Sequence, residues 1–205
     1  DLVLPFFKGI REAIDDVAAV YNDEFEVVYF NGILLGDEVL SLILRDFSWV
    51  GASIVFVFLY ICFHTRSLYL GFSGILMIVS SFVPGYFFYR LILQITFFQT
   101  LHMLSVFVLL GVGADNIFIF TDAWKQFGLD PVASQNLSLQ ATLTFERASL
   151  MCLATTATTF SAFMATGIST IMPISTFGFF AGSVIFCNFV LLIGLYPSML
   201  MVWEK

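Results

Sequence analysis

Apolar residues fall into five long runs that fill most of the chain and are separated by short polar stretches. The runs cover residues 47–63, 68–89, 101–121, 148–171 and 174–203. Because an α-helix rises about 1.5 Å per residue, roughly 20 apolar residues are enough to cross the hydrocarbon core of a bilayer. The pattern therefore predicts five membrane-spanning helices.

The first 46 residues have a different pattern, which predicts the end of a polar α/β domain. Over residues 5–21 apolar residues recur at helical spacing and charged residues fill the opposite face, as in an amphipathic helix. Residues 26–30 are rich in Val and aromatic residues and predict a short strand that ends at Asn31 and Gly32. Asp37 is predicted to cap a second helix that leads to the membrane boundary.

A further stretch, residues 122–147, is too polar to cross a membrane. Polar and apolar residues alternate along it, which is typical of an interfacial amphipathic helix. Pro131 is expected to open the second part of that helix. Trp124 and Phe127 would anchor it at the level of the lipid headgroups, a role that requires no other function. We expect this segment on the cytoplasmic side, between the third and fourth spans.

Composition and charge agree with a membrane protein. Sixty per cent of the residues are hydrophobic, 11% are charged and 26 of 205 are Phe, whereas about a quarter of the residues of a globular protein are charged. Contact with lipid explains many of the Phe residues, and a lipid-binding groove is the sharper alternative. The expected fold is mostly α: a polytopic membrane protein whose five-helix transmembrane half-bundle follows part of a small α/β extracellular domain. Since the chain begins at Asp1 without Met, we expect it to be a piece of a longer polypeptide.

Basic residues in the short loops indicate the orientation. One side holds Arg66, Lys125, Arg147 and Lys205, and the short loop opposite holds Arg90. The positive-inside rule therefore places the first 46 residues outside and the last span's end in the cytoplasm.

The third apolar run contains the strongest candidate for function, Asp115. A carboxylate within a span costs several kcal/mol, so it should face protein or a water-filled cavity, and such acids often mark ion or substrate pathways. Gly111 lies one turn earlier on the same face and Gly113 lies close by, where glycines allow a close helix contact or access for water. A paired structural acid between packing glycines is the alternative.

The fourth run carries a hydroxyl cluster: Thr155, Thr156, Thr158, Thr159 and Ser161. Such hydroxyls usually bond to the carbonyl one turn earlier, which explains them by helix packing alone. Thr155 and Thr159 share a face, however, and could form a hydrated seam opposite Asp115. His102 is about 20 Å along the helix from Asp115 and is predicted to be an interface histidine.

Other chemistry is not expected. Cys62, Cys152 and Cys187 lie in apolar runs without metal-binding spacing, so we interpret them as small buried hydrophobic residues. The sequence has no nucleophile-base pair, metal-ligand spacing or phosphate loop. We therefore expect a protein that is not an enzyme, with no catalytic residues, no metal site, no cofactor and no nucleic-acid partner.

The order of these pieces resembles one half of a resistance-nodulation-division (RND) protein of the Patched family. GVGADNIFIFTDAWKQ at residues 111–126 is similar to the GxGAD motif of Dispatched-like proteins. ERASLMCLATTATTFSAFMATGIS at residues 146–169 and MPISTFGFFAG at residues 172–182 resemble the same proteins in order and spacing. The resemblance covers essentially the whole chain, and residues 47–203 correspond to a sterol-sensing domain.

This resemblance implies a mechanism. Asp115 matches the acid that takes part in a cation or proton relay in these transporters, so Na⁺ or H⁺ is the implied coupling ion. Asn116 stands where many relatives have a second acid; an amide cannot ionise, but its oxygen suits a hard cation. The implied function is half of a cation-coupled transporter that moves sterol or another lipid, or helps release a lipid-modified protein. A sterol-sensing or scaffold module without transport is the alternative.

The implied partners are membrane lipids including sterol, a lipid-modified protein, and the second RND half of the same chain. The implied location is the plasma membrane.

Overall fold

The computed structural model describes residues 9–10, 12–14, 16, 32–131 and 135–204. The chain divides into two compact units, Asp1–Trp49 and Val50–Lys205, and the division falls within one helix, α2 (Gly32–Thr65). All regular structure in the described part is helical. This agrees with the mostly α, polytopic fold expected from the apolar runs.

In the first unit the described residues between 9 and 16 are helical, as predicted for residues 5–21. The strand predicted at residues 26–30 lies outside the described residues. The predicted cap at Asp37 is wrong, because α2 begins at Gly32 and continues without a break through Asp37. A helix that runs on into an apolar span needs no new start at the membrane boundary, so the pattern change at residue 46 marks a change of environment and not a helix end.

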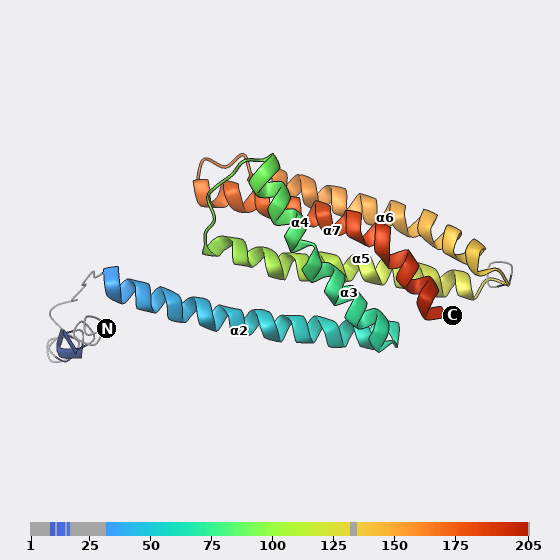
Figure 1. Cartoon of the computed structure of the whole chain (residues 1–205), viewed down its shortest axis with the longest axis horizontal. Helices are drawn as coiled ribbons and strands as arrows, with labels where there is room; N and C mark the ends of the chain where they lie inside the picture. The colour runs from blue at the N-terminus through green and yellow to red at the C-terminus, as the bar shows by residue number, and fades with distance from the viewer. Residues whose placement is uncertain (1–8, 11, 15, 17–31, 132–134, 205) are drawn as a thin grey trace, which may run out of the picture. The chain divides into compact units, whose positions relative to one another are not determined.

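The second unit contains the remaining helices: α3 (Leu68–Ser80), α4 (Phe82–Phe87), η1 (Phe88–Ile92), η2 (Thr100–Met103), α5 (Leu104–Gly128), α6 (Leu137–Thr166) and α7 (Met172–Glu204). Together with the end of α2 they form five stretches that are long and apolar enough to span a membrane: Ser48–Thr65, Leu68–Ile92, Leu101–Gly128, Leu137–Thr166 and Met172–Glu204. The predicted number and order of spans are thus confirmed. Figure 1 shows α5, α6 and α7 running alongside one another, and each contacts the other two.

The second span is broken into three helical pieces. Pro84 has no N–H to donate to the carbonyl of Ser80, and α3 ends at that residue. The next piece, α4, packs closely on α7, since a Cβ added at Gly85 would lie 2.8 Å from Val184 Cα. A π-helical turn, η1, completes the span.

The predicted interfacial helix at residues 122–147 is wrong. Its first part continues α5 to Gly128, and its second part belongs to α6, which begins at Leu137. Asn136 caps α6 by accepting a hydrogen bond from the Ser138 backbone N–H at 3.1 Å, so Asn136 and not Pro131 opens this helix. The polar residues of this stretch therefore lie on the ends of two long helices.

The contact between α6 and α7 brings their backbones close together at Gly178. A Cβ at Gly178 would lie 2.7 Å from the Phe163 carbonyl oxygen and 2.8 Å from the Gly167 nitrogen, so the two backbones approach directly. Farther along, α7 contains Pro197, and the residue before it, Tyr196, shares a 2.9 Å hydrogen bond with Thr121 of α5. These contacts fix α7 against both neighbours.

Candidate functional site

Asp115 lies in α5, near the middle of the third span, and its side chain is exposed. Among the residues that the structure describes, no side chain forms a hydrogen bond or ion pair with its carboxylate. A charge at this depth is costly unless a partner, an ion or water compensates it. The acid is therefore available to a group outside this helix bundle.

Asn116, the next residue, has the opposite environment and is 1% exposed. Its Nδ2 donates to the Thr156 hydroxyl at 3.4 Å, and its Oδ1 accepts from the Thr155 hydroxyl at 3.4 Å. Both threonines belong to α6. The amide therefore joins α5 to α6, and no hydrogen bond links it to Asp115 within the described part of the chain.

Gly111 and Gly113, which precede Asp115, also differ in their surroundings: Gly113 is buried and Gly111 is exposed. A Cβ at Gly113 would lie 2.7 Å from Ile78 Cγ1, so this glycine allows α3 to pack against α5. At Gly111 a Cβ would meet nothing within 4 Å, and the residue is exposed. Of the two predicted packing glycines, only Gly113 makes a close helix contact. Gly111 instead leaves open space on the face that holds Asp115.

The hydroxyl groups of the α6 cluster mostly form hydrogen bonds with backbone carbonyls of α6 itself. Thr155 Oγ1 is 3.2 Å from the Cys152 carbonyl, and Thr159 donates to the Thr155 carbonyl at 2.9 Å. The hydroxyl that is buried at the α5–α6 contact is that of Thr156, which is 4% exposed. The structure thus brings Thr155 and Thr156 to Asn116, while Thr159 forms no hydrogen bond to α5 in the described part of the chain.

His102, the predicted interface histidine, lies at the start of the Leu101–Gly128 span and is buried within the bundle. It is 1% exposed, its ring stacks on Phe98 at a centroid distance of 4.5 Å, and Phe180 lies 5.2 Å away. Its Nε2 is 3.4 Å from the Tyr89 hydroxyl. The histidine therefore fixes the start of η2 within an aromatic cluster built from the second, third and fifth spans.

Two polar features were missed in the sequence. Asn188 in α7 is 0% exposed, and neither its side-chain nitrogen nor its side-chain oxygen has a hydrogen-bond partner among the residues that the structure describes. His64 Nε2 lies 2.8 Å from Asp122 Oδ1, which connects the end of α2 to α5. An Asn inside an apolar run could have signalled the first. The second joins residues 58 positions apart, and no local pattern indicates such a pair.

Comparison with known proteins identifies the family. Residues 47–205 match the model of the sterol-sensing domain of SREBP cleavage-activation. The chain belongs to the sterol-sensing domain family. It is also Dispatched-like: it is 30% identical to human protein dispatched homolog 1, over 91% of this chain and 13% of that protein. It is 28% identical to Drosophila melanogaster protein dispatched, over 93% of this chain and 17% of that protein.

The chain therefore spans about an eighth to a sixth of the length of these relatives. Its five apolar helices make it part of an integral, multi-pass membrane protein. In the described residues no group of three or more His, Cys, Asp or Glu side chains is arranged to hold a metal ion.

Proposed function

We propose that this sterol-sensing domain is one half of a cation-coupled RND-type transporter that moves sterol or another lipid, or helps release a lipid-modified protein. The observation that supports this most directly is Asp115, an exposed acid near the middle of the Leu101–Gly128 span. On insertion scales an acid at the centre of a span costs about 3 kcal/mol. That cost is removed if a cation, a proton or a group of the second half neutralises the carboxylate.

The surroundings of Asp115 suit such a role. Because a Cβ at Gly111 would meet nothing within 4 Å, there is room for an ion or water one turn from the carboxylate. Sodium is a hard cation and takes oxygen ligands, whereas proton coupling needs only the acid itself. Because Asn116 is engaged with α6, we assign ion coupling to Asp115 and helix positioning to Asn116.

The same proposal covers the partners and the location of the protein. The second RND half would cover the face of α5 that holds Gly111 and Asp115, and membrane lipids, including sterol, would contact the exposed aromatic surface. The protein would act at the plasma membrane and would move its substrate without enzymatic chemistry. We include a lipid-modified protein as cargo because the motifs at residues 111–126 and 146–169 resemble those of Dispatched-like proteins.

Asp115→Asn in the complete protein tests the proposal. The change keeps the shape of the side chain and removes its charge, and a neutral amide is cheaper to bury. We expect surface abundance to remain normal and gradient-dependent transport or release to be lost. Asp122→Asn is the matched control, because Asp122 lies on the same helix but pairs with His64 at 2.8 Å. Normal activity of Asp115→Asn at normal abundance would refute ion coupling.

A sterol-sensing or scaffold module without transport is the second candidate. It is favoured by Asn116, whose amide cannot ionise and contributes to the contact between α5 and α6. If this candidate is correct, Asp115→Asn and the control will leave the activity of the complete protein equally unchanged, or will lower it only as abundance falls.

A further inference from the structure

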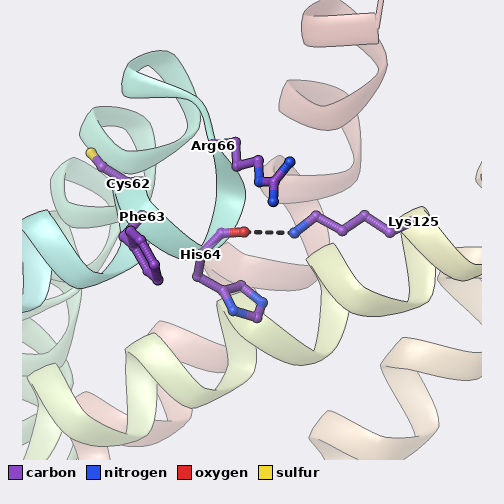
Figure 2. Close-up of a pocket in the computed structure, with 5 residues that line it drawn as sticks. All are labelled: Cys62, Phe63, His64, Arg66 and Lys125. Carbon is purple, nitrogen blue, oxygen red and sulfur yellow. Dashed lines mark hydrogen bonds between the residues drawn. The ribbon is translucent and has the colours of Figure 1, made fainter.

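A pocket lies at the end of α2, away from Asp115. Its volume is about 700 Å³, and it is lined by Cys62, Phe63, His64, Arg66 and Lys125. Figure 2 shows Arg66 reaching into this region from the turn after α2, and Lys125 reaching into it from α5. Two permanent cations thus line one pocket, and none of the described lining residues is an acid.

The turn that carries Arg66 is held in place by its neighbours. Thr65 is 1% exposed, and its hydroxyl donates to the Ile61 carbonyl at 2.8 Å. Ser67 caps the start of α3 by accepting from the Leu70 N–H. Arg66 itself has a φ of 55°, a backbone conformation that residues other than glycine rarely adopt. The arginine is therefore presented by a defined turn and not by a free loop.

Both cations have donors to spare. Lys125 Nζ donates to the His64 carbonyl at 2.6 Å, which leaves two of its three hydrogens. Among the described residues no acid or carbonyl pairs with the Arg66 guanidinium, which presents a fork suited to phosphate or carboxylate. The nearby acid, Asp122, is held by His64. The pocket therefore has charge complementarity to an anion.

The surroundings favour a lipid over a free ion. The pocket lies where the Ser48–Thr65 and Leu68–Ile92 spans meet, at the boundary of the apolar region. Phe63 is 83% exposed and Leu68 is 74% exposed, so apolar surface borders the cations. A basic pocket between spans beside such surface suits an anionic headgroup with its acyl chains alongside. The same end carries the basic residues that the positive-inside rule assigns to the cytoplasm.

We infer that Arg66 and Lys125 bind the phosphate of an anionic glycerophospholipid in this pocket. Bound there, the headgroup would connect the α2–α3 turn to α5. This matters for α2 because only 11% of its span is buried by the other helices. The site is separate from Asp115 and does not depend on the transport proposal.

The test uses the purified full chain in phosphatidylcholine nanodiscs with or without phosphatidylserine, and measures retention of a fluorescent phosphatidylserine and the melting temperature. We expect retention above that of fluorescent phosphatidylcholine, and a higher melting temperature with the anionic lipid. One charge near a membrane surface contributes about 1 kcal/mol, so Arg66→Gln should weaken binding about fivefold. Arg147→Gln, which removes an exposed charge outside the pocket, should leave binding nearly unchanged.

Three results would overturn the inference. The first is equal retention of the two fluorescent lipids by the unmodified chain. The second is equal weakening by Arg66→Gln and Arg147→Gln, which would indicate diffuse charge attraction. The third is stabilisation by inorganic phosphate in pure phosphatidylcholine nanodiscs that matches the effect of phosphatidylserine, which would assign the pocket to a free ion. Lys125→Gln is a second variant, and it should weaken binding by a similar factor.

Discussion

Asp115 and Asn116 are consecutive residues of α5 with opposite environments: Asp115 is exposed, and Asn116 is 1% exposed and hydrogen-bonded to α6. Consecutive helical residues point about 100° apart, so one turn of helix can serve two purposes. The Asp115 carboxylate points away from the helix bundle, and the Asn116 amide connects α5 to α6 within it.

This relationship predicts different effects of the two substitutions on stability. Asn116→Ala removes both contacts to Thr155 and Thr156 and leaves a small cavity, so we expect the free energy of unfolding to fall by about 1–3 kcal/mol. Asp115→Asn should leave it nearly unchanged. Thermal unfolding of the two variants in the same detergent measures the difference. Equal destabilisation by both would contradict the separate roles.

Gly178 predicts a steric effect at the α6–α7 contact. A methyl group there would meet the backbone of Phe163 and Gly167, which cannot move aside as a flexible side chain can. We expect Gly178→Ala to destabilise the protein by about 1–3 kcal/mol. Gly111→Ala is the matched control, because it enters open space. Measured loss of folded protein after heating should be confined to Gly178→Ala, and a similar loss in the control would point to helix propensity or lipid contact instead.

Asn188 predicts a stabilising substitution. A buried polar group without a hydrogen bond costs about 1–3 kcal/mol, and Leu has a similar size. We therefore expect Asn188→Leu to raise the melting temperature, while Asn188→Ala, which also opens a cavity, should gain less or lose stability. If Asn188→Leu instead lowers the melting temperature, the amide has a partner in the complete protein.

The orientation of the chain predicts labelling from opposite sides. Gln94 lies in the exposed connection after η1, and Gln135 lies in the exposed connection before α6. After replacement of the three native cysteines, a Gln94→Cys variant should react with an impermeant maleimide in intact cells. A Gln135→Cys variant should react only after permeabilisation. Reaction of both from outside would rule out the positive-inside assignment.

The spans could be predicted from sequence because a bilayer demands a fixed length of apolar helix, and each run from 47–63 to 174–203 satisfies it. The candidate acid could be found for the same reason, since a charge inside such a run stands out. Helix ends were harder. The sequence becomes polar at residue 122 and apolar again near residue 147, but neither change coincides with a helix end, because α5 continues to Gly128 and α6 already begins at Leu137. An interfacial helix was therefore predicted where the ends of α5 and α6 extend beyond the apolar region.

Side-chain partners could not be predicted, because they join residues far apart in the sequence. His102 is enclosed by Phe180 of α7 and Tyr89 of the second span as well as by the nearby Phe98. Asn116 matched a motif position, but its contact to Thr156 depends on how α5 and α6 are rotated against each other. The apolar pattern of α6 is too uniform to set that rotation.

Pro197 makes α7 easier to bend at one point. Proline has no N–H, so the Ile193 carbonyl receives no bond from that position, and the helix resists bending less there than elsewhere. On one side of this weak point, Gly178 holds α7 to the backbone of α6. On the other side, Glu204 accepts a hydrogen bond from Trp124 of α5 at 3.1 Å. If the end of α5 moved, the last two turns of α7 would consequently move with it. The helix would bend at Pro197, and the contact between Gly178 and α6 would be unchanged.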